Sequence, residues 1–273
     1  MNVYIFDVDG VISDPKEKRP TIEGVLDIIA DKLSKNEPVA LNTGRSLSWM
    51  IERVITPLLL KVKDKKSLQN FFAVGEKGGT WLTFDEEGRM EQHKDDSISV
   101  PSELQERVKQ LVAEEFSETT FYDASKETMI STEMIDGFTT EEREQLYRPA
   151  QQGLVPRLEE LLSERGMEAS FKVDPTTIAT DVENKHVGKD FAVRRILTWL
   201  ELRGVVTPGK FIAFGDSKSD IPMAEELHRQ GLSVELVFVG DKPINSDDFP
   251  FPVTVTKGHF EQGTLEYLST KTS

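Results

Sequence analysis

The sequence of 273 residues contains no cysteine, which excludes disulfide bonds, catalysis by a thiolate and zinc sites that cysteine would hold. Basic residues are also scarce relative to acidic ones, 33 against 48, so the formal net charge is −15. Because this charge repels a phosphate backbone and no basic run offsets it, we expect no nucleic-acid partner. A small anionic substrate is compatible with this charge, because a bound cation or a few lysines decide local binding.

Long apolar runs are missing as well, so no segment is expected to span a bilayer and no membrane partner is expected. The first apolar segment begins next to Met1, which leaves no room for a signal peptide and predicts a cytoplasmic protein. With 37% hydrophobic residues, the chain is polar but has enough apolar side chains for one large domain or two modest ones.

What the sequence does contain is an alternation of short apolar runs with amphipathic segments of helical spacing. The apolar runs predict strands at 3–8, 38–41, 71–74, 211–214, 234–239 and 253–255, with a hairpin strand at 80–84. The amphipathic segments predict helices at 21–33, 47–58, 187–202, 221–230 and 263–268. Strands that alternate with helices imply right-handed crossovers, so we expect an α/β fold with a doubly wound parallel sheet.

The middle of the chain differs from both ends. From about residue 87, long charged helical segments alternate with short strands, predicted at 127–134, 170–173 and 177–180. We interpret this stretch as a separate α/β module inserted into the first domain. The predicted organisation is therefore one domain built from 1–86 and 185–273, and an inserted domain at 87–184.

The strand predicted at 3–8 carries the first candidate site. It is apolar except for Asp7, as expected for a strand buried on both faces. Because burying an unpaired carboxylate costs on the order of several kcal/mol, Asp7 should lie at the carboxyl end, followed by Asp9 and a turn at Gly10. Open α/β folds bind ligands at this edge, and two carboxylates there suit Mg²⁺. The alternative is a strand that merely ends in an acidic turn.

A second polar cluster, Thr43-Gly44-Arg45, lies between the strand predicted at 38–41 and a predicted helix. Backbone N–H groups at the start of a helix favour an anion, and the Thr43 hydroxyl can donate to a phosphate oxygen. The alternative is that Thr43 or Ser46 only caps the helix.

A third cluster, Asp216 and Asp220, follows the strand predicted at 211–214. Parallel strands end at the same edge of a sheet, so all three clusters are expected to meet there. Three separate strands that end in polar residues favour one functional site over three unrelated caps and turns.

In these stretches the sequence resembles the haloacid dehalogenase-like phosphohydrolases. The matching stretches occur in the family's order: Asp7-Val8-Asp9-Gly10, Leu41-Asn42-Thr43-Gly44-Arg45, Lys189 with Ala192 and Ile196, and Gly215-Asp216-Ser217-Lys218-Ser219-Asp220. The inserted module resembles the large α/β cap of the sugar-phosphatase-like branch, whose Glu-Asn-Gly turn is matched with Lys77 in place of Asn. The resemblance implies a Rossmann-like doubly wound core with an inserted α/β cap.

The resemblance also implies roles for the acidic residues. Asp7 would be the nucleophile that attacks phosphorus, and Asp9 would act first as general acid and then as general base. Mg²⁺ would be held by the Asp7 side chain, the Asp9 carbonyl group and Asp216. Asp220 would orient a lysine or a metal-bound water.

The phosphoryl group would be bound by Thr43, by the N–H group of Gly44 and by a lysine that also pairs with the nucleophile. Two lysines compete for this role. Lys189 has the family's spacing into the following helix and is preferred, whereas Lys185 lies just behind the preceding strand. Arg45 follows the phosphate-binding turn and would either bind phosphate or pair with an acidic residue.

Together these expectations indicate a Mg²⁺-dependent phosphoric monoester hydrolase that acts through an aspartyl-phosphate. Its substrate would be a small phosphorylated metabolite, either a sugar phosphate or a phosphorylated hydroxy acid. Two alternatives stay open: a phosphotransferase or phosphomutase that uses the same intermediate, and a non-catalytic sensor of a phosphorylated ligand. The intact Asp9 argues against the sensor, which has no use for a general acid. The sequence does not rank Lys172, Asp174 or Arg143 as specificity residues and indicates no oligomeric state.

Overall fold

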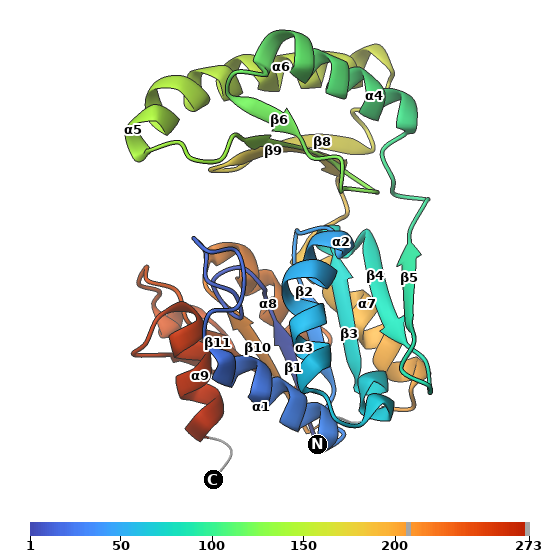
Figure 1. Ribbon diagram of the computed structural model, residues 1–273, viewed down its shortest axis with the longest axis vertical. Coiled ribbons are helices and arrows are strands. Elements are labelled where there is room, and N and C mark those ends of the chain that lie inside the picture. The colour runs from blue at the N-terminus through green and yellow to red at the C-terminus, as the bar shows by residue number, and fades with distance from the viewer. Residues whose placement is uncertain (206–208, 271–273) are drawn as a thin grey trace. The chain divides into compact units, whose positions relative to one another are not determined.

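The computed structural model describes residues 1–205 and 209–270. The chain divides into two compact units (Figure 1). One, called here the core unit, comprises Met1–His93 and Gly188–Ser273, and the other, the inserted unit, comprises Lys94–Val187. The structure therefore divides the chain a few residues later than the expected boundaries at 87 and 185.

Within the described residues, the core unit is built on an eight-stranded sheet in the order β12-β11-β10-β1-β2-β3-β4-β5. The strands are β1 (Asn2–Phe6), β2 (Val39–Asn42), β3 (Phe71–Gly75), β4 (Thr80–Phe84), β5 (Met90–Lys94), β10 (Lys210–Gly215), β11 (Val234–Phe238) and β12 (Val253–Val255). The pairs from β12 to β3 are parallel, and β4 is antiparallel to β3. The strand β5 was not predicted because its sequence is polar, and four of its five residues are exposed.

Helices cover both faces of this sheet, so its central strands are apolar in successive positions. The helices are α1 (Glu23–Ser34), α2 (Leu47–Met50), α3 (Thr56–Lys61), α7 (Lys189–Leu202), α8 (Ile221–Arg229) and α9 (Phe260–Thr270), with a π-helical turn, Ile51–Ile55, joining α2 to α3. Tyr4 and Phe6 pack with α1, α3 and α9, whereas Val3 and Ile5 pack with α7 and α8 (Figure 1). The predicted doubly wound α/β fold is confirmed, with an antiparallel edge added to the parallel core.

The inserted unit is a four-stranded antiparallel sheet in the order β6-β7-β9-β8, counted within the described residues. The strands are β6 (Thr120–Tyr122), β7 (Ile130–Met134), β8 (Phe171–Pro175) and β9 (Ala179–Asn184). The helices are α4 (Ser102–Leu111), α5 (Thr140–Glu142) and α6 (Arg148–Glu164). Ile130 and Val182 pack against Leu104 of α4 and Leu158 of α6, so one face of the sheet forms a separate core.

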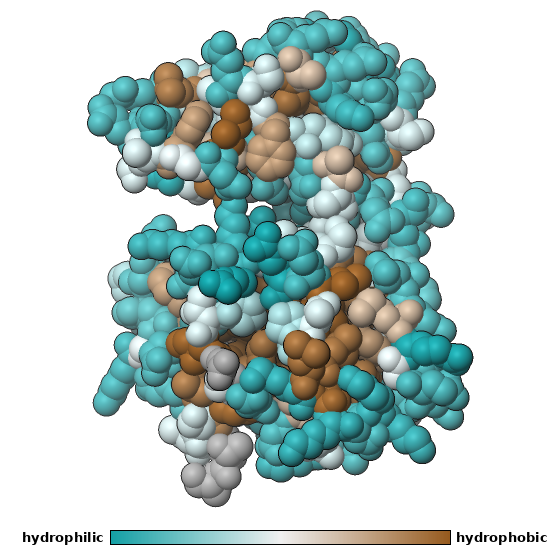
Figure 2. Space-filling model, in the orientation of Figure 1, coloured by the Kyte–Doolittle hydropathy of each residue, from teal (hydrophilic) through white to brown (hydrophobic). Residues whose placement is uncertain are grey.

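The visible surfaces of the two units are mainly hydrophilic, with apolar side chains gathered over part of the core unit (Figure 2). Across the described residues, no helix combines the length and the apolar character needed to cross a bilayer.

Candidate active site

The first strand delivers Asp7 to the carboxyl edge of the sheet. Its backbone N–H donates to the Phe214 carbonyl group at 3.0 Å, which continues the pairing of β1 with β10. Asp7 is buried, with 8% of its surface exposed. The chain then turns at Gly10, whose φ is +72°, so Asp9 follows Asp7 in a tight loop.

The loop after β2 contributes Thr43 and Arg45. Thr43 is buried, its N–H donates to the Val74 carbonyl group at 3.0 Å, and its hydroxyl accepts from the Arg45 N–H at 3.2 Å. The cap of the following helix is Ser46, whose side chain accepts from the N–H of Trp49. Of the two residues considered as the cap, Ser46 therefore has this role.

Arg45 points to Asp9. Its Nε lies 3.0 Å from Asp9 Oδ2 and its Nη2 3.1 Å from Asp9 Oδ1, so the guanidinium group holds both carboxylate oxygens. The guanidinium also lies over the Trp49 ring, 4.8 Å from its centroid. Of the two expected roles, the structure places Arg45 in the ion pair with an acidic residue.

Lys189, at the start of α7, connects the loops. Its Nζ lies 2.5 Å from Asp7 Oδ1, 3.0 Å from Asp220 Oδ1 and 2.6 Å from the Asn42 carbonyl oxygen. The Asn42 side chain donates back to the Lys189 carbonyl group at 2.9 Å. Lys185 belongs to the inserted unit, and its side chain is exposed. Of the two candidate lysines, the structure thus places Lys189, the preferred one, in contact with Asp7. No role was predicted for Asn42, although a polar residue at the end of a buried strand is a signal for one.

The loop after β10 is closed by Asp220. Its Oδ2 accepts from the N–H groups of Asp216 and Ser217 and from the Ser217 hydroxyl, each at 3.1 Å. A Cβ atom added to Gly10 would lie 2.2 Å from Asp216 Oδ2. Glycine is therefore required at position 10 both for its positive φ and for the close approach of Asp216.

The turn that follows β3 is tied to this site. The Lys77 N–H donates to the Thr43 carbonyl group at 3.0 Å, and its carbonyl group accepts from the Gly188 N–H at 3.0 Å. Glu76 and Lys77 have φ values of 49° and 55°, and two consecutive non-glycine residues in this region are strained. The Lys77 side chain runs beside Gly44.

The loops after β1 and β10 create a cluster of carboxylates. Asp7, Asp216 and Asp220 each offer an oxygen atom, and these atoms lie within 4.8 Å of one another. Burial raises the pKa of Asp7 well above its usual range, and the Asp220 charge raises it further, against the opposing effect of Lys189. Burial, followed by Asp220, raises the pKa of Asp216 to about 7. Burial opposes the charge of Lys189, but Asp220 and Asp7 outweigh it and raise the pKa of the ammonium group.

Besides burial, the raised pKa values of Asp7 and Asp216 share a second cause. The cluster holds more negative charge than a single lysine neutralises, so two carboxylates gain from binding a proton. At neutral pH, a divalent cation would reduce the repulsion among the carboxylates in the same way as a proton. The arrangement can thus hold a cation against a buried carboxylate that is already positioned by an ammonium group.

Comparisons with known proteins address the fold. No protein-family model matches the chain, and no curated protein matches its sequence. Among solved structures, it is similar to the C-terminal domain of C. albicans trehalose-6-phosphate phosphatase, with a TM-score of 0.65 and 15% identity over 98% of this chain and 91% of that one. A trehalose-6-phosphate phosphatase related protein gives a TM-score of 0.59 and 15% identity, with coverages of 98% and 96%.

An N-terminally truncated IMP-nucleotidase of Plasmodium falciparum is similar as well, with a TM-score of 0.58 and 15% identity over 99% of this chain and 70% of that one. Identities this low establish a common architecture and leave activity to be argued from the site. The chain therefore shares its fold, an α/β core with an inserted module, with these solved structures.

Proposed function

We propose that the protein is a Mg²⁺-dependent phosphatase that hydrolyses a small phosphorylated metabolite through a phosphoryl group carried on Asp7. The observation that carries this proposal is the contact of Asp7 with Lys189 beside Asp216 and Asp220. Keeping three carboxylates in a partly buried cluster is costly, and the stability of the sheet does not require it. The fold shared with a phosphatase, a phosphatase-related protein and a nucleotidase supports the same activity.

The donor set fits Mg²⁺, because carboxylate and carbonyl oxygens are the ligands that this ion prefers. In the proposed site the ion is held by the side chains of Asp7 and Asp216 and by the Asp9 carbonyl group. Asp220 belongs to the same cluster, but its Oδ2 accepts three hydrogen bonds and its Oδ1 faces Lys189. We therefore assign Asp220 mainly to orienting the lysine. A bound Mg²⁺ ion would neutralise carboxylate charge and the charge of the transferring phosphoryl group.

The phosphate group of the substrate is bound by the Thr43 hydroxyl, the Gly44 N–H group and Lys189. The ammonium group of Lys189 already touches Asp7, so one cation can contact both the nucleophile and the incoming phosphate. In this proposal, Arg45 holds Asp9 next to the reacting atoms and does not bind phosphate.

The chemistry takes two steps. In the first, a carboxylate oxygen of Asp7 attacks phosphorus, and the bond from phosphorus to the ester oxygen of the substrate breaks. The leaving oxygen takes a proton from Asp9, which must be protonated and released from at least one hydrogen bond to Arg45. In the second, water attacks phosphorus and gives a proton to Asp9, and the bond from Asp7 to phosphorus breaks. Phosphate leaves, and both aspartates return to their initial state.

The proposed substrate class rests on the names of the similar structures. The similar structures are named for trehalose-6-phosphate and IMP, both small phosphate monoesters. We propose a sugar phosphate or a phosphorylated hydroxy acid as the substrate. A phosphotransferase or phosphomutase would share the first step and replace water by a second hydroxyl group.

The test is the release of phosphate from an aryl phosphate, measured with Mg²⁺ and with EDTA. We expect turnover by the wild-type protein with Mg²⁺, loss of turnover in EDTA and its recovery when Mg²⁺ is added back. Asp7→Asn should abolish turnover. Asp27→Asn replaces an exposed carboxylate that pairs with Lys61 and should leave turnover unchanged.

Four results would overturn the proposal. Undiminished turnover in EDTA would exclude the metal, and undiminished turnover by Asp7→Asn would exclude the nucleophile. Saturable binding of phosphorylated metabolites without any phosphate release would instead indicate a sensor. Transfer of the phosphoryl group to an added sugar in preference to water would indicate the phosphotransferase.

A further inference from the structure

The core unit contains a cavity near the end of the sheet opposite to the carboxylate cluster. Its volume is about 560 Å³, and it lies against the first residues of β1 and β10, between the end of α1 and α9. Tyr4 lines this cavity and precedes Asp7 by three residues, a separation of about 10 Å along the strand. The volume is typical of a small-molecule site. The cavity is thus separate from the proposed active site but connected to it through β1.

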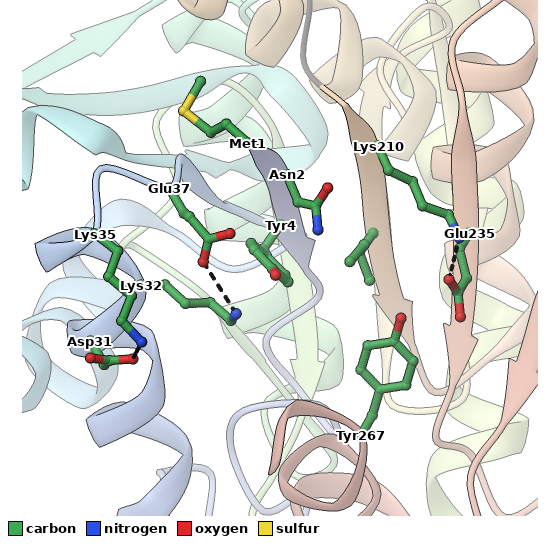
Figure 3. Close-up of a pocket in the computed structure, with 11 residues that line it drawn as sticks. Met1, Asn2, Tyr4, Asp31, Lys32, Lys35, Glu37, Lys210, Glu235 and Tyr267 are labelled. Atoms are coloured by element: carbon green, nitrogen blue, oxygen red, sulfur yellow. Dashed lines mark hydrogen bonds and ion pairs between the residues drawn. The ribbon is translucent and has the colours of Figure 1, made fainter. Parts of the chain in front are cut away.

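Two ion pairs, Lys32–Glu37 and Lys210–Glu235, lie on opposite sides of the cavity (Figure 3). On one side, Lys32 Nζ lies 3.4 Å from Glu37 Oε2 and 3.7 Å from the centroid of the Tyr4 ring. On the other, Lys210 Nζ lies 2.5 Å from Glu235 Oε2. Tyr4 and Tyr267 lie between the two pairs in Figure 3, and together with Ile212 they supply apolar surface.

Two of the charged side chains in these walls are buried more deeply than those of surface ion pairs usually are. Lys32 is 3% exposed and Glu235 is 8% exposed. Removing charged groups from water costs several kcal/mol per ion by order of magnitude, and an ion pair recovers that cost only with good geometry. Lys32 lies near the end of α1, next to the buried Leu33, and contacts Glu37 and the Tyr4 ring. An apolar side chain would pack there at lower cost, so the packing of α1 does not by itself require a charge at this position.

The side-chain charges that line the cavity cancel. Three lysines each contact one carboxylate: Lys35 with Asp31, Lys32 with Glu37, and Lys210 with Glu235. In a chain of net charge −15, this is a locally balanced set of side chains. An anion would meet three carboxylates and a cation three ammonium groups, so neither gains overall. A hydroxyl group, in contrast, can donate to a carboxylate and accept from an ammonium group at once.

We propose that this cavity is a second ligand site, separate from the phosphatase site, for an uncharged molecule with several hydroxyl groups, such as a monosaccharide or a cyclic polyol. Its hydroxyl groups bridge the Lys32–Glu37 pair and the Lys210–Glu235 pair. Its less polar face lies on Tyr4 and Tyr267.

The test uses the full-length protein in EDTA, which empties the proposed metal site. D-glucose and myo-inositol are titrated by calorimetry, with glycine and inorganic phosphate as charged probes. We expect saturable binding of at least one of the two neutral probes and a loss of affinity of about tenfold or more in Lys32→Met and in Lys210→Met. Lys61→Met removes a lysine of α3 outside this cavity and should bind as the wild type does.

A second measurement is independent of whether the variants fold. Backbone amide shifts of the wild-type protein, followed by NMR during the same titration, should change at Asn2, Tyr4, Lys32 and Ile212. No saturable binding of either neutral probe up to about 10 mM would overturn the proposal. So would a preference for phosphate or glycine, or shifts centred on Asp7 and Asp216 instead.

Discussion

Lys189 contacts three oxygens that come from three separate segments of the chain: a carboxylate of Asp7, a carboxylate of Asp220 and the carbonyl group of Asn42. Its ammonium group therefore holds Asp7, the proposed nucleophile, and also joins the strands β1 and β2 to the loop after β10. At the scale of single residues, it is the group on which we expect both the proposed chemistry and the local stability to depend.

Replacing this ammonium group should have a large effect. Lys189→Met keeps the length of the side chain but leaves a buried carboxylate cluster without its cation. We expect kcat to fall at least a hundredfold and the free energy of unfolding in EDTA to fall by about 3 kcal/mol. Steady-state kinetics and urea unfolding measure the two effects.

Lys185→Met is the matched control, because Lys185 is exposed and belongs to the inserted unit. It should change neither kcat nor the free energy of unfolding by more than a small amount. A large loss in Lys185→Met together with near-normal activity in Lys189→Met would reverse the assignment of the lysine.

The choice between these two lysines marks a limit of sequence reasoning at this scale. Both follow the last strand of the inserted unit closely, and hydrophobic spacing does not define the first residue of α7. The pairing of Arg45 with Asp9 was likewise one of two alternatives, because it depends on how two loops meet in space. Lys32 would be read as a solvated helix lysine, although it is buried against Tyr4.

Individual strands and loops were easier to predict. The strand β1 is apolar on both faces because helices cover both sides of the sheet, and this pattern is visible in Val3–Val8. An unpaired carboxylate is costly inside a buried strand, and this cost located Asp7 correctly at the end of β1. The edge strand β5 lacks this signal, since one polar strand at the border of a sheet resembles a loop.

The turn after β1 gives a prediction at the scale of the element. In Gly10→Ala the new Cβ atom would lie 2.2 Å from Asp216 Oδ2, so Asp216 must move. We expect a loss of about 1 kcal/mol from the positive φ and, in addition, a loss of Mg²⁺ affinity of about tenfold or more. Thermal unfolding and the Mg²⁺ dependence of turnover measure these effects.

Gly231→Ala separates the two causes. Gly231 has a φ of +74°, nearly that of Gly10, but a Cβ atom there would meet nothing within 4 Å. It should lose a similar amount of stability and keep the Mg²⁺ dependence of the wild type. An equal loss of Mg²⁺ affinity in both variants would show that the close approach of Asp216 is not what matters.

The whole molecule carries a strong excess of negative charge, and the carboxylate cluster adds to it inside the core unit. Because the pKa values of Asp7 and Asp216 are raised, the folded protein holds protons that the unfolded chain has already lost. Without a divalent ion, these two groups therefore make the free energy of unfolding fall as pH rises from about 4 to about 7.

Mg²⁺ should reverse this trend, because it replaces the protons. We expect Mg²⁺ to raise the unfolding temperature more at about pH 7 than at about pH 5, since protons compete with it at the lower pH. Calorimetric unfolding with Mg²⁺ and with EDTA at both pH values measures the difference. In Asp216→Asn the effect of Mg²⁺ should be small at both, and an effect as large as that in the wild type would exclude Asp216 as a ligand.

The most direct test of the account asks whether Asp7 carries the phosphoryl group. The variant Asp9→Asn is mixed with an aryl phosphate and Mg²⁺, quenched in acid and digested with a protease. The mass of the peptide that contains Asp7 is then measured by mass spectrometry. An aryl leaving group needs little help from a general acid, so the first step proceeds while hydrolysis is slowed. The account predicts one phosphoryl group on Asp7, absent in the double variant Asp7→Asn, Asp9→Asn. Phosphate release by the wild type with no phosphorylated Asp7 in Asp9→Asn, or with the label on another residue, would contradict it.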